Sequence, residues 1–168
     1  MRELLIIRHA IAHERDPSAW PNDDARPLTE LGIKKFRQAA RGLAQLVEAP
    51  EELLTSPLQR ARQTASILEA RAAFPAALVL EALRPDTEAA AVVAALNRRR
   101  AERIAIVGHE PDLSRLIGVL TSGLGARAVV EMKKGAVAHL TFAKRIEPGA
   151  GLLTALFPPR ALRSVGKA

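Results

Sequence analysis

The chain contains no cysteine and few aromatic side chains. Without cysteine it can form no disulfide bond, no thiolate nucleophile and no cysteine-ligated metal site. Aromatic residues make up 3% of the 168 residues, so leucine, isoleucine, valine and alanine must build the core. No apolar run approaches the length of a membrane span, and no secretory signal is evident. We therefore expect a cytoplasmic protein that does not enter a membrane.

Acidic residues are outnumbered by basic ones, 18 to 25, which gives a net charge of +7. The resulting field favours anionic ligands and phosphorylated partners. It would also favour nucleic acid, but the basic residues are spread along the chain, aromatic side chains for base stacking are scarce, and no nucleic-acid-binding motif is present. We expect no nucleic-acid partner.

Length and apolar content suit one folded domain over residues 1–168, because 48% of the residues are hydrophobic and neither a linker nor a repeat divides the chain. Apolar runs alternate with segments of helical periodicity. Strands are predicted near residues 3–7, 53–54, 78–80, 104–107, 136–142 and 152–156, and helices near 29–47, 56–72, 87–97 and 111–122. This alternation predicts an α/β protein, a three-layer α/β/α sandwich with a mostly parallel central sheet. The chain from Pro158 onward is expected to be irregular.

Two helix starts have recognisable capping signals. Thr29 is a plausible N-cap for the first helix. Ser56 is expected to cap the second, with Pro57 at the first helical position and Gln59 completing a capping box. This arrangement puts Arg60 in the first turn, where exposed backbone amides attract anions.

Two arginines and two histidines follow predicted strands or begin the next helix: Arg8, His9, Arg60 and His109. Ligands of open α/β sheets bind beyond the carboxyl ends of the strands, so three strand ends could bring these residues together. Arginine presents planar paired donors that match phosphate oxygens. The set therefore predicts a phosphate site.

The same residues suggest a chemistry. Positive charge from Arg8 and Arg60 would lower the pKa of His9 and keep a lone pair available for attack on phosphorus. A protonated His109 and the backbone N–H of Glu110, before the following helix, would stabilise charge on the phosphoryl oxygens. Because the arginines would neutralise that charge, no metal and no cofactor are expected.

Three segments resemble the core motifs of the histidine phosphatase superfamily, which has the phosphoglycerate mutase-like fold. They are residues 5–10 (LIIRHA), 55–65 (TSPLQRARQTA) and 107–111 (VGHEP), in the family's order and spacing. The resemblance implies that His9 is the phosphorylated nucleophile and that Arg8, Arg60 and His109 form the phosphate pocket.

Further features resemble the SixA-type phosphohistidine phosphatases within that superfamily. These are the small size, alanine rather than the commoner glycine at position 10, the absence of an inserted cap domain, and residues 156–163 (LFPPRALR). The resemblance implies a phosphorylated protein as partner, dephosphorylated at phosphohistidine.

The substrate depends partly on a proton donor. Phosphomonoesterases of this superfamily usually carry a carboxylic acid that protonates the leaving oxygen. Glu81 and Asp86 lie in the right interval, but the usual pattern around the acid is absent. A phosphoramidate needs the acid less, because imidazole leaves readily from phosphorus, so phosphohistidine is favoured. The alternatives are a small phosphorylated substrate and a non-catalytic phosphate-binding module; in each case a monomer is expected.

The remaining polar residues have ordinary structural explanations. Ser56 is expected mainly as a helix cap, with phosphate orientation as its alternative role. His13 is expected to be a solvent-exposed loop residue, His139 a structural strand residue, and Trp20 a packing residue of the loop before the first helix. None of these is expected to bind a metal.

Overall fold

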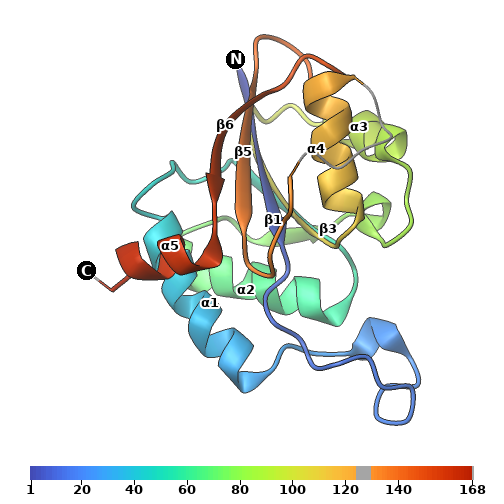
Figure 1. The fold of residues 1–168 in the computed structure, drawn as a ribbon. Coiled ribbons are helices and arrows are strands. Elements are labelled where there is room, and N and C mark those ends of the chain that lie inside the picture. Colours follow the sequence, from blue (N-terminus) through green and yellow to red (C-terminus); the bar gives the residue numbers. More distant parts are fainter. Residues whose placement is uncertain (124–129, 168) are drawn as a thin grey trace.

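The computed structural model describes residues 1–123 and 130–167, in which six strands and five α-helices alternate along the chain (Figure 1). The strands are β1 (Arg2–Arg8), β2 (Glu52–Thr55), β3 (Ala77–Val79), β4 (Arg103–Gly108), β5 (Val137–Phe142) and β6 (Leu152–Phe157). The α-helices are α1 (Glu30–Leu43), α2 (Gln59–Ala72), α3 (Ala89–Asn97), α4 (Asp112–Ser122) and α5 (Pro159–Val165), with short 3-10 helices η1 (Asp23–Ala25) and η2 (Glu81–Leu83). Within these residues, no helix combines the length and apolarity needed to cross a membrane.

The six strands form one sheet in the order β3-β2-β4-β1-β5-β6. The first four pair in parallel, and β5 and β6 add two antiparallel pairings at one side. Strands β2, β4 and β1 are therefore neighbours, although they lie far apart in the sequence. The predicted mostly parallel α/β sheet is confirmed.

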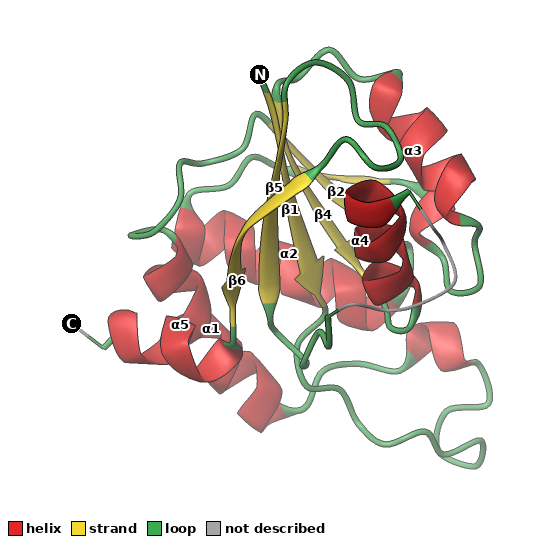
Figure 2. Cartoon of the chain, turned by 45° about the horizontal axis from the view of Figure 1, so that its top comes forward, coloured by secondary structure: helices red, strands yellow, loops and turns green. Residues whose placement is uncertain are grey.

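Apolar side chains of β1 face both sides of the sheet. Leu5 and Ile7 belong to a core cluster with residues of α1, α2 and α5, whereas Leu4 and Ile6 belong to a cluster with residues of α3 and α4. Successive strand residues point to opposite faces, so a continuous apolar run marks a strand that is covered on both. Figure 2 shows the two groups of helices on either side of the sheet, which confirms the three-layer sandwich.

The two predicted helix starts have different outcomes. Thr29 is the N-cap of α1, and its hydroxyl accepts a hydrogen bond from the Gly32 N–H at 2.9 Å. The prediction for Ser56 was wrong, because α2 begins at Gln59 with Leu58 as N-cap. The Ser56 N–H instead donates to the Val107 carbonyl at 3.0 Å, which keeps Ser56 in the extended chain beside β4.

The tail beyond Pro158 is helical, which corrects the expectation of an irregular end. Helix α5 begins with Pro159, whose fixed φ suits the first turn of a helix. It packs against α1 (Figure 1, Figure 2). Close approach needs two glycines, since a Cβ on Gly42 would meet the Leu162 carbonyl and a Cβ on Gly166 would meet the Gln38 carbonyl. Helix α5 is thus part of the fold.

Candidate active site

The site begins where three adjacent strands end. Arg8, the last residue of β1, pairs in register with Gly108, the last residue of β4. His9 directly follows β1, and His109 directly follows β4. Ser56 directly follows β2, which lies on the other side of β4 from β1. Parallel strands end at the same edge of a sheet, so the predicted convergence of these segments is present in the structure.

His9 is buried and held in one tautomer. Its backbone N–H donates to the Gly108 carbonyl at 3.1 Å, and its Nδ1 lies 2.7 Å from the Ala10 carbonyl oxygen. A carbonyl only accepts, so Nδ1 carries the proton and Nε2 keeps its lone pair.

The electrostatic surroundings keep His9 neutral. Burial, together with the charges of Arg60, Arg8 and Lys134, lowers the pKa of His9 to about 3, although the hydrogen bond to the Ala10 carbonyl opposes this shift. The direction agrees with the sequence-based expectation, but burial rather than the arginines is the largest cause. A neutral imidazole with a free lone pair is the form that attacks phosphorus.

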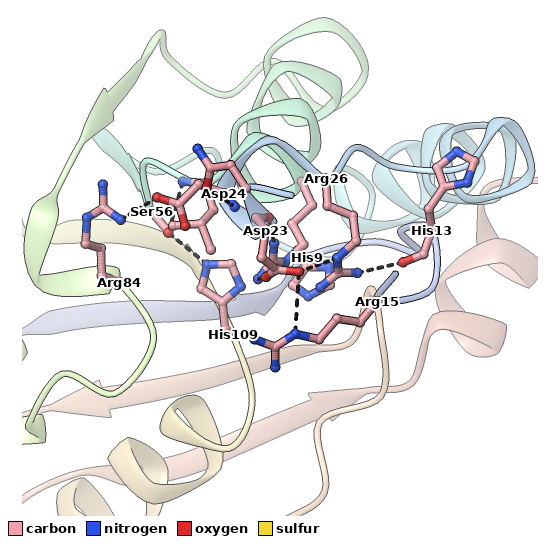
Figure 3. A network of polar contacts seen from close by, with 12 residues as sticks. His9, His13, Arg15, Asp23, Asp24, Arg26, Ser56, Arg84 and His109 are labelled. Atoms are coloured by element: carbon pink, nitrogen blue, oxygen red, sulfur yellow. Dashed lines mark hydrogen bonds and ion pairs between the residues drawn. The ribbon is translucent and has the colours of Figure 1, made fainter. Parts of the chain in front are cut away.

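His109 lies beside His9, with ring centroids 5.2 Å apart and the planes tilted by 51°. Its Nε2 lies 2.8 Å from Oγ of Ser56 (Figure 3). Burial, followed by the nearby charges of His9 and Arg60, lowers the pKa of His109 to about 3. The His109 ring is therefore neutral in the protein without a phosphoryl group, because burial outweighs the charge of Asp23, which favours protonation. That His109 is protonated when a phosphoryl group is bound stays a prediction.

Arg60 is the second residue of α2, so the prediction that it lies in the first turn is confirmed. Its side chain is almost fully buried. Nη1 donates to the Asp23 carbonyl at 2.9 Å, and Nη2 lies 3.2 Å from the Asp23 carboxylate. Asp23 thus supplies a negative charge to Arg60 from a loop that is distant in sequence.

The loop that carries Asp23 is fastened by several ion pairs, which the sequence analysis missed. The Asp23 carboxylate also lies 2.8 Å from Nε of Arg26 and 3.9 Å from Nε of Arg15 (Figure 3). The hydrogen bond from Arg26 holds the pKa of Asp23 below its usual value, despite partial burial. Asp24 pairs with Arg84 at 2.8 Å and so joins this loop to the segment after η2. In the sequence, the only indication of these ion pairs was two adjacent aspartates in a proline-rich loop.

Arg8 and Glu110 lie close enough for their charges to interact. Nη1 of Arg8 donates to the Met132 carbonyl at 2.7 Å. Burial raises the pKa of Glu110, although the charge of Arg8 opposes this shift. Within residues 1–123 and 130–167, the Glu110 backbone N–H donates no hydrogen bond, as a group available to an anion should.

Thr64 connects the loop after β1 to α2, another contact that the sequence did not reveal. Its hydroxyl accepts from the Ala10 N–H at 3.0 Å and donates to the Arg60 carbonyl at 2.7 Å. Thr64 follows Arg60 by one helical turn, which is the spacing that could have identified it. It is a positioning residue, since it fixes the residue after His9 relative to α2.

The two candidate acids lie outside this cluster. Glu81 is exposed and its carboxylate lies 2.9 Å from Nε of Arg84. Asp86 lines a separate surface pocket beside Asp112, which accepts the Asp86 N–H at 2.8 Å. Among the described residues, neither carboxylate forms a hydrogen bond or ion pair with His9 or the other core residues.

The other histidines lie in different settings. His13 is exposed in the loop after β1, where its ring lies 5.6 Å from that of Trp20. His139 lies on β5, with Nε2 3.1 Å from a Glu3 carboxylate oxygen. These positions agree with the loop and strand placements expected from the sequence.

Three buried nitrogens have no hydrogen-bond partner among the described residues: Nε of Arg8, Nε of Arg60 and Nδ1 of His109. Buried donors are normally satisfied, because leaving one without an acceptor costs about 1–3 kcal/mol. Two guanidiniums and an imidazole beside a nucleophilic nitrogen suit an anion with several acceptor oxygens. A tetrahedral phosphoryl group has that form.

Comparisons with known proteins agree with this geometry. The family model described as histidine phosphatase superfamily (branch 1) matches residues 4–84. An uncharacterised protein of Picosynechococcus sp. is 36% identical over 148 residues, which cover 86% of this chain and 88% of that protein.

Solved structures share the whole fold. The protein histidine phosphatase SixA, solved with tungstate, has a TM-score of 0.79 and 28% identity, covering 95% of this chain and 99% of its own. The mycobacterial glucosyl-3-phosphoglycerate phosphatase Rv2419c has a TM-score of 0.69 and covers 92% of this chain and 97% of its own; at 18% identity it supports the fold alone. By its motifs, its sheet and these relatives, the chain belongs to the histidine phosphatase superfamily, within the SixA-type branch.

Proposed function

We propose that residues 1–168 form one metal-independent phosphatase domain, which transfers a phosphoryl group from phosphohistidine in a protein to Nε2 of His9. The observation that carries this proposal is the hydrogen bond from Nδ1 of His9 to the Ala10 carbonyl at 2.7 Å. It leaves Nε2 as the unprotonated nitrogen of a buried imidazole whose pKa is lowered to about 3. The nucleophile is therefore ready at neutral pH without a base to deprotonate it.

The reaction has two steps. In the first, the Nε2 lone pair attacks phosphorus, the substrate P–N bond breaks, and the departing imidazole takes a proton from solvent. In the second, water attacks phosphorus and releases a proton to solvent, the bond to Nε2 breaks, and phosphate leaves with His9 restored. Arg8, Arg60, His109 and the Glu110 N–H would bind the phosphoryl oxygens, with Ser56 acting through His109.

Phosphohistidine is favoured over a phosphoester because the candidate acids lie apart from the core residues. Glu81 is paired with Arg84, and Asp86 lines a different pocket from His109. An alkoxide leaving group needs a proton donor near the phosphoryl group, whereas an imidazole leaving group depends less on such a donor. A small phosphoester is the second candidate, because the pocket with Asp86 and the pocket with His109 share Thr87, Ala89 and Asp112 in their linings.

The test is a rapid-quench labelling experiment with a ³²P-phosphohistidine protein. The wild-type protein should acquire acid-labile, alkali-stable label and release phosphate. His9→Ala should acquire none, whereas the matched variant His13→Ala, at an exposed loop histidine, should behave as wild type. Label retained in His9→Ala would overturn the nucleophile assignment, and phosphate binding without turnover would indicate a non-catalytic module.

A second measurement separates the two substrate classes. Turnover of the phosphohistidine protein is compared with that of sugar phosphates, in the wild type and in Asp86→Ala and Glu81→Ala. We expect the protein substrate to be preferred and both variants to retain that activity. Preference for the esters, lost in either variant, would instead support the phosphomonoesterase.

A further inference from the structure

A basic groove lies between α1 and α5. Its volume is about 410 Å³, and its lining includes five basic side chains: Lys34, Lys35, Arg160, Arg163 and Lys167. Among the described residues, no acidic side chain lines it. In the described part of the chain none of the five forms an ion pair, whereas many other arginines do.

The concentration of charge in this groove is not needed for folding. Helix α5 is held against α1 by the buried Leu162 and by the close contacts at Gly42 and Gly166. Four of the five cations lie on the same two helices and Lys167 follows α5. They have no compensating carboxylates among the described residues, so they repel one another. Uncompensated like charges in a concave surface attract an anionic ligand.

The groove continues toward the catalytic pocket. A smaller depression shares Lys35 and Arg163 with it and is also lined by Ala10 and Lys134. Ala10 follows the proposed nucleophile directly, and the charge of Lys134 reaches His9, whose pKa it helps to lower. A ligand in the groove therefore lies beside the phosphoryl site rather than on a remote face.

We propose that the α1–α5 groove docks an acidic segment of the phosphorylated protein whose phosphohistidine enters the catalytic pocket. This inference rests on the proposed function and deepens it, because it names the feature that selects the substrate. Carboxylate side chains match the five cations, and the continuity of groove and pocket suits a chain that carries the phosphohistidine and the acidic segment together. Nucleic acid fits less well, since no aromatic side chain lines the groove for base stacking.

The experiment uses two synthetic phosphohistidine peptides that differ only in a flanking segment of glutamates or glutamines. The groove variant is Lys34→Gln/Arg160→Gln/Lys167→Gln, which changes three exposed side chains. The matched control, Arg98→Gln/Arg100→Gln/Lys144→Gln, removes the same charge from exposed residues near the opposite end of the sheet. Phosphoramidate serves as the substrate that is too small to reach the groove.

We expect the wild type and the control to turn over the glutamate peptide with a kcat/KM about tenfold above that of the glutamine peptide, an advantage that high salt removes. The groove variant should lose this preference through KM, with its activity on phosphoramidate unchanged. Equal kcat/KM values for both peptides in the wild type would overturn the docking proposal while leaving the phosphatase proposal intact.

Binding is measured separately from turnover, so that failure of the proposed function can be recognised. Fluorescence anisotropy of an unphosphorylated glutamate peptide should show binding to the wild type and about tenfold weaker binding to the groove variant. Binding without hydrolysis of any phosphohistidine substrate would overturn the proposed function but not the groove as an acidic-peptide site. The wild type and the groove variant are also compared for binding to single-stranded DNA and to vesicles of anionic lipid. If the groove variant loses binding to either of these but binds the peptide as the wild type does, the docking proposal is overturned.

Discussion

Nε2 of His109 lies 2.8 Å from Oγ of Ser56, and the same oxygen accepts the Leu58 N–H at 3.3 Å. A hydroxyl that accepts from an amide can donate its own proton to the imidazole. Nε2 of His109 is then the acceptor, and Nδ1 carries the proton and has no partner among the described residues. Ser56 thus sets the tautomer of His109.

Substituting Ser56 should consequently affect catalysis as well as folding. We expect Ser56→Ala to lower kcat about tenfold, because the imidazole loses the partner that orients it. Stability should fall by roughly 1–3 kcal/mol, since a buried nitrogen loses its hydrogen bond. Steady-state kinetics and urea unfolding measure the two effects, with Ser66→Ala, exposed on α2, as the control. An unchanged kcat would make Ser56 purely structural.

Stability should decrease on mild acidification because both site histidines are buried in the neutral form. Their pKa values are lowered from 6.5 to about 3 by burial. Below pH 6.5 the unfolded chain binds protons at both histidines and the folded chain does not. Each histidine therefore costs ~1.4 kcal/mol of stability per pH unit as the pH falls from 6.5 toward 3.

Urea unfolding between pH 6.5 and 5 tests this dependence, above the range in which most carboxylates titrate. His9→Gln should remove about half of the contribution of the two site histidines to the slope. An equal slope in the wild type and His9→Gln would show that His9 is protonated in the folded protein.

Asp23 and a phosphoryl group should compete for the same guanidinium. The Asp23 carboxylate lies 3.2 Å from Nη2 of Arg60, so Asp23→Asn removes a negative charge from the site. We expect inorganic phosphate to inhibit the variant about fivefold more strongly, which corresponds to about 1 kcal/mol of relieved repulsion. Asp16→Asn removes the same charge from an exposed position in the same loop and should have little effect. Weaker inhibition would indicate that Asp23 organises Arg60 for binding.

The contact between α1 and α5 should tolerate no side chain at Gly42. Alanine normally stabilises a helix relative to glycine by about 0.5–1 kcal/mol. Gly42→Ala should instead destabilise the protein by roughly 1–3 kcal/mol, because its Cβ would meet the Leu162 carbonyl. Thermal unfolding measures the change, and a stabilised variant would show that α5 moves aside without cost.

The parts of the site that could be predicted are those attached to buried strands. Arg8 and His9 follow an apolar run, as do Gly108 and His109, and parallel pairing then brings these residues to one edge. The carbonyl of Ala10 and the burial of His9 could not be deduced from spacing. Both depend on the folded loop after β1, so the sequence analysis named only the arginines as the cause of the lowered pKa and did not identify burial.

The errors have local explanations. Ser56 has a capping sequence, but the Val107 carbonyl binds its N–H and keeps it at the end of β2. Helix α5 has only one fully covered apolar residue, Leu162, so its seven residues have no periodicity to detect. Asp23 meets Arg60 across 37 positions of sequence, through a loop whose path depends on other ion pairs.

The three adjacent strand ends limit which parts of a protein with this fold can be exchanged without loss of its chemistry. Neighbouring strands lie about 4.8 Å apart, and this spacing sets the separation of the groups around phosphorus. The loop with Asp23, the segment with Arg84 and the helix α5 are attached outside that frame. Exchanging these peripheral parts should alter which molecule is accepted while the phosphoryl chemistry persists. Reactivity thus depends on the strand ends, and selectivity depends on the parts attached around them.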